Sequence, residues 1–288
     1  MSVINTNISA LVGLNNLRLT NLGLQTSLER LSSGLRINKG ADDPSGLAIA
    51  KHMEAQINGA RVAVQNAEDG ISLIHTADGA LAETHDILMR MRDLSVRAAN
   101  EATLTSADVR RINKEFTELK EELDRKSQAV SFNNKVLFNG TFSNGLQLQI
   151  GPDNGTNHRL SIVINAMTLT GLGIVAGGAS VVISTMGATP ATATLSAAWQ
   201  ALDVVNSAIN IVSDQRAFLG IQERRLGHVI DDLKAQDINV SAAKSRIWDA
   251  DMASEISEFT RLQILQQSGT AILAQANAQP QSVLQLLR

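Results

Sequence analysis

The sequence contains no cysteine and no tyrosine, and aromatic residues make up only 3% of its 288 positions. Without cysteine the chain can form neither a disulfide bond nor a thiolate metal site, and it has no cysteine nucleophile. Such a chain can cross a narrow export channel unfolded without forming stray crosslinks. A cytosolic protein that happens to lack cysteine fits the same observation equally well.

Membrane-spanning and targeting segments are also missing from the sequence. No stretch approaches the roughly 18 uninterrupted apolar residues of a transmembrane helix. Residues 1–16 lack the basic start and the apolar run of a cleaved secretory signal, so we expect none. The formal net charge of -3 does not indicate binding to nucleic acid or to anionic lipid. We therefore expect no nucleic-acid partner and no membrane insertion.

Motifs of catalysis and metal binding are absent as well. The five histidines include no H-E-x-x-H arrangement and no pair four residues apart. His75 and Asp78 are explained better by a solvated helix surface than by a metal site. The glycines of residues 171–177 have the wrong spacing for a dinucleotide-binding loop, and no G-x-S-x-G elbow is present. We predict no enzyme, no metal site and no cofactor.

Helical periodicity is the main positive signal. Apolar residues recur at alternating steps of three and four, which predicts five amphipathic helices at residues 14–35, 50–99, 109–130, 198–233 and 252–276. The stripe of the fourth segment includes Leu202, Ile209, Arg216 and Glu223, and the stripe of the second drifts after Leu88. The two terminal stripes consist of Leu14, Leu17, Asn21, Leu24, Leu28, Leu31, Leu35, Met252, Ile256, Phe259, Leu262, Leu265, Gly269, Ile272 and Ala276. Asn21 is the one polar residue in the first stripe, and it can fix the register of a helical pair at some cost in stability.

The middle of the chain has a different pattern. Apolar residues alternate over 146–150 and 160–164 and flank a turn sequence at 151–155, which predicts a β-hairpin. Residues 166–195 are rich in Gly, Ala, Ser and Thr and form a short insert in which Val181 to Ile183 could be a strand. Asp43 and Pro44 indicate the start of the second helix. We expect connectors at 35–42 and at 235–245, so that both halves of the chain are organised as mirror images.

Both ends of the chain are almost free of charge. Residues 1–28 contain one charged side chain, Arg18, and residues 262–287 contain none. A solvent-exposed helix normally carries charges on its outer face, so their absence predicts burial on all sides. One seam of leucines is unlikely to offset the conformational entropy of an ordered terminus, so we expect these ends to be mobile in the monomer and ordered by assembly. A helical hairpin buried within a monomer is the alternative.

Several motifs resemble those of bacterial flagellins. They lie at both ends of the chain in the same order as in that family, and the resemblance covers roughly residues 1–165 and 196–288. The matching segments are INTN at 4–7, LERLSSGLRIN at 28–38, DDPSG at 42–46, NAEDGIS at 66–72, FN at 132–133, LFNG at 137–140, SRIWDADMA at 245–253 and PQSVL at 280–284.

The resemblance implies a mainly α protein in which a long antiparallel helical bundle or coiled coil is formed by both chain ends. In this arrangement residues 1–45 with 240–288 form the filament core, and 46–165 with 196–239 form a helical bundle with a β-hairpin. It also implies self-assembly into an extracellular helical filament through Leu14, Leu17, Leu24, Leu28, Leu31, Leu35, Ile256, Phe259, Leu262, Leu265 and Ile272.

Other partners follow from the resemblance alone. They are an export chaperone at the C-terminal helix, hook-junction and filament-cap proteins, and the vertebrate toll-like receptor for flagellin. The receptor contacts would be Arg90, Leu94 and Glu115, which also fit a role in subunit packing. The short insert at 166–195 leaves no room for a bulky outer domain, and the missing H-E-x-x-H motif argues against the protease type.

The sequence is also compatible with three alternatives. A hook–filament junction protein shares the terminal helices but does not elongate filaments. A secreted helical effector or a helical enzyme would remain soluble. The flagellum itself could be extracellular or, as in spirochaetes, periplasmic.

Overall fold

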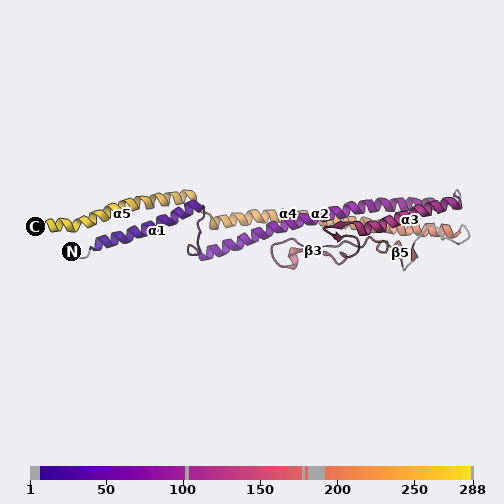
Figure 1. Cartoon of the computed structure of the whole chain (residues 1–288), viewed down its shortest axis with the longest axis horizontal. Coiled ribbons are helices and arrows are strands. Elements are labelled where there is room, and N and C mark those ends of the chain that lie inside the picture. Colours follow the sequence, from indigo (N-terminus) through magenta and orange to yellow (C-terminus); the bar gives the residue numbers. More distant parts are fainter. Residues whose placement is uncertain (1–6, 101–103, 177–178, 181–191, 287–288) are drawn as a thin grey trace. The chain divides into compact units, whose positions relative to one another are not determined.

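The computed structural model describes residues 7–100, 104–176, 179–180 and 192–286. Its elements are α1 (Ile8–Ser33), α2 (Pro44–Ala98), α3 (Ser106–Ala129), β1 (Ser131–Phe132), β2 (Lys135–Val136), β3 (Leu146–Gln149), the 3-10 turn η2 (Thr156–His158), β4 (Arg159–Ile162), β5 (Val175–Ala176), β6 (Ala179–Ser180), α4 (Thr192–Trp248) and α5 (Met252–Leu286) (Figure 1). Contacts divide the chain into two units, residues 1–57 with 238–288 and residues 58–237. The predicted fold class, mainly α with antiparallel helices and a small β-hairpin, is confirmed.

Side-chain and glycine caps mark the ends of the first helices, and the start predicted at Asp43 is among them. The side chain of Asn7 accepts a hydrogen bond from the backbone N–H of Ala10 and begins α1. Asp43 accepts one from Gly46 at 2.8 Å and begins α2 as predicted. Gly34, at a φ of 71°, ends α1, because a residue in the left-handed region stops a helix at low cost when it is glycine. Leu35 therefore lies beyond the helix whose stripe was predicted to include it.

The predicted connector at 235–245 is wrong. This stretch contains neither Gly nor Pro, and α4 continues through it to Trp248. The break lies at residues 249–251 instead, where Asp249 forms an isolated antiparallel bridge with Leu35. On either side of that bridge, the N–H of Ala250 donates to Gly34 and the N–H of Arg36 donates to Trp248. The two connectors of the chain are thus paired with each other.

In residues 58–237, α2 and α4 run antiparallel around the main core. Three side-chain pairs show the antiparallel direction, because residue numbers rise along α2 as they fall along α4. The pairs are Arg61 with Asp237, Asp78 with Arg216, and Arg92 with Asn206. The predicted stripe drift after Leu88 is wrong, since burial continues at regular steps through Met91, Ser95 and Ala98. The polar position Ser95 fits because its hydroxyl donates to the carbonyl of Met91 within the helix.

The stripe predicted for α4 agrees with the buried residues at alternate positions only. At the positions between, the buried residue precedes the predicted one by one place in the sequence. The buried positions are Ala198, Ala201, Val205, Ala208, Val212, Gln215, Leu219, Gln222 and Leu226. The prediction placed the large apolar Leu202 and Ile209 in this seam instead of alanines, and it placed Arg216 and Glu223 there instead of two glutamines. At the surface Arg216 pairs with Asp78, and Glu223 with His75.

The predicted hairpin is confirmed. β3 and β4 pair antiparallel, with Leu146 opposite Ile162 and Leu148 opposite Leu160. The predicted third helix is also confirmed as α3, which buries Ile112, Phe116 and Leu123. The small hairpin β1–β2 was missed, although Asn133 and Asn134, both at positive φ, form a turn between its strands. The possible strand at 181–183 lies outside the described residues.

Two glycines on α2 allow the β3–β4 hairpin to pack closely against this helix. A Cβ at Gly70 would lie 2.5 Å from a methyl of Leu148, and a Cβ at Gly59 would lie 2.7 Å from the Cβ of Pro152 and 3.2 Å from its Cα. The neighbour of Gly59 is a rigid ring and its backbone, so it cannot move aside by a rotamer change. Gly79, on the same helix, has open space around it.

These contacts predict opposite effects for the same substitution on one helix. Gly59→Ala is expected to lower the free energy of unfolding by about 1–3 kcal/mol, because the added methyl overlaps Pro152. Gly79→Ala is expected to raise it by about 0.5–1 kcal/mol through helix propensity alone. Urea denaturation followed by circular dichroism measures both. Equal and stabilising effects would show that the loop does not rest on Gly59.

Candidate assembly surface

The two ends of the chain form an antiparallel helical pair. Near one end of the pair, the side-chain amide of Asn7 donates to the carbonyl of Ala276 at 2.8 Å. Near the other, the hydroxyl of Ser27 donates to the carbonyl of Glu255 at 3.4 Å. Figure 1 shows α1 and α5 side by side between these contacts. Residues more than two hundred positions apart in sequence therefore share one seam.

Glycines allow the two helices to approach each other closely. Leu262 lies over Gly23, where an added Cβ would be 3.4 Å from both of its methyls. Gly13 receives Leu273 in the same way, and Gly269 receives Leu17 at 3.3 Å. Each large side chain thus packs against a residue without a side chain on the partner helix. A stripe of large apolar residues in the sequence does not reveal this complementarity, because the glycines contribute no apolar side chain.

Polar groups in the seam are paired across it. Asn21, predicted to fix the register, accepts a hydrogen bond from the side-chain amide of Gln266 at 2.9 Å. At the end of the seam, Arg30 lies 3.8 Å from the carboxylate of Glu255. If α1 and α5 shifted along each other, the hydrogen bond between the side-chain amides of Asn21 and Gln266 would be lost.

The predicted self-assembly residues fall into two groups. Leu17, Leu24, Leu31 and Phe259 are half-buried and Leu262 is buried, so these line or border the α1–α5 seam. Leu14, Leu28, Ile256, Leu265 and Ile272 are exposed, while Leu35 is half-buried in the connector. One helix–helix contact covers only part of each helix surface, so the exposed group is not covered by the described residues of its own chain.

The exposed group belongs to a larger apolar surface. Within the described parts of α1 and α5, twelve large apolar side chains are 43–66% exposed. They are Ile8, Leu11, Val12, Leu14, Leu19, Leu22, Leu28, Met252, Ile256, Ile264, Leu265 and Ile272. Several of these were not predicted individually, although the lack of charge over residues 1–28 and 262–287 indicated most of them. We call these twelve residues the terminal apolar surface.

A polar cluster lies next to the paired connectors. The ammonium groups of Lys51 and Lys244 lie 5.1 and 5.7 Å from the ring centre of Trp248, which are cation–π distances. Both also approach the carboxylate of Glu54, at 2.9 and 3.8 Å. The hydrogen bond from Lys51, with the positive charge of Lys244, lowers the pKa of Glu54. This cluster joins the start of α2 to the end of α4.

The predicted receptor residues do not share one environment. Arg90 on α2 donates through Nε to the carboxylate of Glu115 on α3 at 2.8 Å, and both are exposed. Leu94 is only 2% exposed and belongs to the main core. The structure therefore brings Arg90 and Glu115 together at the surface but places Leu94 beneath it.

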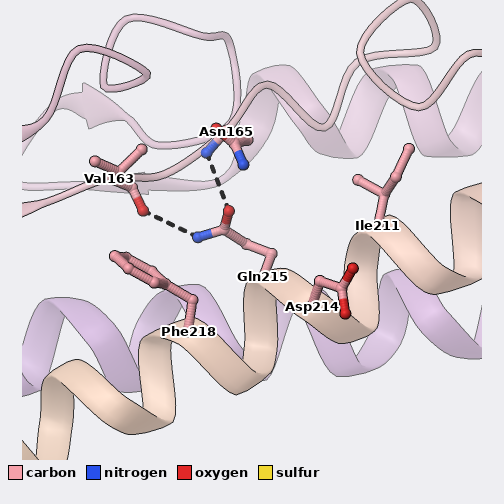
Figure 2. Close-up of a pocket in the computed structure, with 6 residues that line it drawn as sticks. All are labelled: Val163, Asn165, Ile211, Asp214, Gln215 and Phe218. Carbon is pink, nitrogen blue, oxygen red and sulfur yellow. Dashed lines mark hydrogen bonds between the residues drawn. The ribbon is translucent and has the colours of Figure 1, made fainter.

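A pocket of about 430 Å³ lies beside α4 (Figure 2). On its floor Gln215 donates to the carbonyl of Val163 at 3.0 Å and accepts from the N–H of Asn165 at 3.4 Å. The Gln215 amide thus pairs with the extended chain after β4 as a neighbouring strand would.

Among the described residues, no group of histidines, aspartates or glutamates is arranged to hold a metal ion. No helix in the described segments is apolar enough over sufficient length to span a membrane.

Paired terminal helices with an uncovered apolar surface define a class of structural protein, the subunit of a helical assembly. The model of the bacterial flagellin N-terminal helical region matches residues 4–143, and the model of the bacterial flagellin C-terminal helical region matches residues 202–287. The chain belongs to the bacterial flagellin family. It is accordingly a structural subunit of the flagellar filament and not an enzyme.

Individual relatives cover the whole chain. The chain is 45% identical to the flagellin of Bacillus subtilis over an alignment 304 positions long, gaps included, which covers 99% of each chain. It is 39% identical to flagellin FlaB2 of Treponema pallidum over an alignment of 295 positions, which covers 99% of this chain and 100% of the relative. A putative flagellar hook-associated protein from Vibrio parahaemolyticus has a similar fold, with a TM-score of 0.59 at 14% identity, over 72% of this chain and 100% of that one.

Proposed function

We propose that copies of this chain polymerise into an extracellular helical filament for motility by burying the terminal apolar surface against neighbouring copies. The observation that supports this most strongly is that α1 and α5 keep many exposed apolar side chains after they have paired, and that residues 1–28 and 262–287 contain one charged side chain between them. Covering twelve side chains that are about half exposed would contribute on the order of 10 kcal/mol per subunit. In this proposal residues 1–45 with 240–288 form the filament core and 46–165 with 196–239 the bundle around it.

Seeded polymerisation tests the proposal. Monomer at a concentration where it stays soluble is mixed with sonicated filament seeds and imaged by negative-stain microscopy. We expect the seeds to elongate, and residues 1–45 and 240–288 to become protected from protease as they do so. Removing residues 262–288, which carry the charge-free end, should prevent elongation. Monomer that stays soluble beside active seeds would contradict the proposal and favour a junction protein or a soluble effector.

The same surface supports partners outside the filament. Before export, an unassembled subunit exposes the apolar side chains of α5, and a chaperone that binds this helix would keep them from aggregating. Hook-junction and filament-cap proteins would contact the same helices at the two ends of the filament. In the primary proposal the flagellum is extracellular. The alternative is a periplasmic flagellum of the spirochaete type, and it is supported by the similarity to the Treponema relative.

A second proposal concerns recognition by the vertebrate toll-like receptor for flagellin. It is favoured by the exposed pair of Arg90 and Glu115, whose charged groups could exchange one hydrogen bond for contacts to a receptor. Because Leu94 is buried, its role in this proposal is to hold α2 in place beneath the pair.

A further inference from the structure

The turn between β3 and β4 contains an Asn-Gly pair in which Asn154 is exposed and Gly155 is half-buried. The Nη2 of Arg159, five residues later, donates to the side-chain oxygen Oδ1 of Asn154 at 2.6 Å. The stretch 151–155 lies between the strands and belongs to neither of them. A positively charged donor to the side-chain oxygen of this asparagine affects the deamidation to which Asn-Gly pairs are prone.

Asparagine followed by glycine can deamidate without an enzyme. The backbone nitrogen of the glycine attacks Cγ of the asparagine, which has little steric hindrance because glycine has no Cβ. The new bond is N–Cγ, the broken bond is Cγ–Nδ2, and Nδ2 leaves as ammonia with the proton released by the backbone N–H. Water then opens the cyclic imide at either carbonyl to give aspartate or isoaspartate. During the attack negative charge develops on Oδ1.

The sequence contains four Asn-Gly pairs, and the structure distinguishes them. Asn58 and Gly59 lie inside α2, where the helix fixes the backbone. The N–H of Gly145, after Asn144, is held by the carbonyl of Phe142 at 3.0 Å. In both pairs the attacking nitrogen is committed to other hydrogen bonds or to a regular helix.

The remaining two pairs differ in the donors to Oδ1. Asn139 accepts from the N–H and the hydroxyl of Thr141, which are neutral groups of its own tight turn. Asn154 accepts from a guanidinium, whose positive charge stabilises a developing oxyanion more strongly than a neutral donor does. No hydrogen bond from the N–H of Gly155 is found among the described residues, so the nucleophile of this pair is available.

We propose that Asn154 is a site of spontaneous deamidation and that Arg159 accelerates the reaction by stabilising the oxyanion at Oδ1. The reaction requires only water and proceeds faster as pH rises, because base removes the proton of the attacking N–H. The product adds a negative charge beside Arg159, and isoaspartate also lengthens the backbone of the turn. That turn rests on α2 through Pro152 at Gly59, so the modification marks and alters one defined surface of an ageing subunit.

Peptide mapping of the full-length protein tests the site. Protein is incubated at neutral and mildly alkaline pH, digested, and analysed by mass spectrometry with fragmentation that separates aspartate from isoaspartate. We expect conversion at residue 154 to exceed conversion at residues 58, 139 and 144 in the folded protein. In protein unfolded with guanidinium the four sites should react at comparable rates, because the structural differences are removed.

The role of Arg159 is tested by a matched set of variants. Arg159→Gln is expected to slow conversion at residue 154 about tenfold, and Arg159→Lys by less, because Lys keeps the charge. Arg125→Gln removes an exposed arginine that pairs with Glu122 instead and should leave the rate unchanged. Melting curves establish that each variant is folded. Faster conversion at another pair, or an unchanged rate in Arg159→Gln, would overturn the proposal.

Discussion

Leu14→Glu is expected to prevent seeded elongation at concentrations where the unchanged protein elongates, while leaving the monomer folded. Leu14 is 57% exposed in the single chain, and Glu has a helix propensity close to that of Leu, so the helix should tolerate the change. In the proposed filament the same position is covered by neighbouring copies, where an unpaired carboxylate costs several kcal/mol. A cost of about 3 kcal/mol would raise the concentration needed for elongation roughly a hundredfold. Sedimentation of seeded samples across a concentration series measures this value.

Two variants serve as controls for this experiment. Leu14→Met keeps an apolar side chain of similar volume and should elongate almost normally. Val62→Glu places the same charge at a site that is 54% exposed but stands beside the ion pair of Arg61 and Asp237. Its charged surroundings can accommodate a carboxylate, so elongation should be affected far less. If Leu14→Glu elongated like these controls, the terminal apolar surface would not be the assembly interface.

The helices could be predicted from sequence because burial at steps of three and four leaves a strong pattern. The exact seams could not, since close packing uses residues that a search for large side chains ignores. Gly23 and Gly269 accept leucines from the partner helix, and Ala201 and Ala208 occupy seam positions that Leu202 and Ile209 were expected to fill. Steric fit between two helices is a property of the pair and is not encoded in either stripe alone.

The sequence predicted that the chain ends carry an apolar surface, but it did not predict all the residues that form this surface. The lack of charge at both ends indicated burial on all sides, and this is why exposed residues such as Leu11 and Ile264 fit the proposal without having been named. Leu14 and Leu28 were expected to share one seam with Leu24, but α5 covers only the seam side of α1. The sequence pattern could not show which face the intramolecular partner takes and which remains for other copies.

Leu94 shows how a residue assigned by family resemblance can have a different physical role. Leu94→Ala is expected to lower the free energy of unfolding by about 2–5 kcal/mol, because it removes a side chain that is 2% exposed from the main core. Arg90→Ala removes one exposed ion pair with Glu115, and its cost should be about 0–1 kcal/mol. Thermal unfolding of both variants, followed by circular dichroism, provides the comparison.

Two further variants separate core packing from receptor contact. Val96→Ala truncates a residue on the same helix that is 49% exposed, and it should cost little stability. Leu94→Met conserves volume and should restore most of the stability lost in Leu94→Ala. In a receptor-reporter assay performed well below the melting temperature, Arg90→Ala should reduce the signal without destabilising the protein, and Leu94→Met should retain it. A Leu94→Ala protein of unchanged stability with a lost signal would show that Leu94 contacts the receptor directly, and that α2 exposes this side chain in solution.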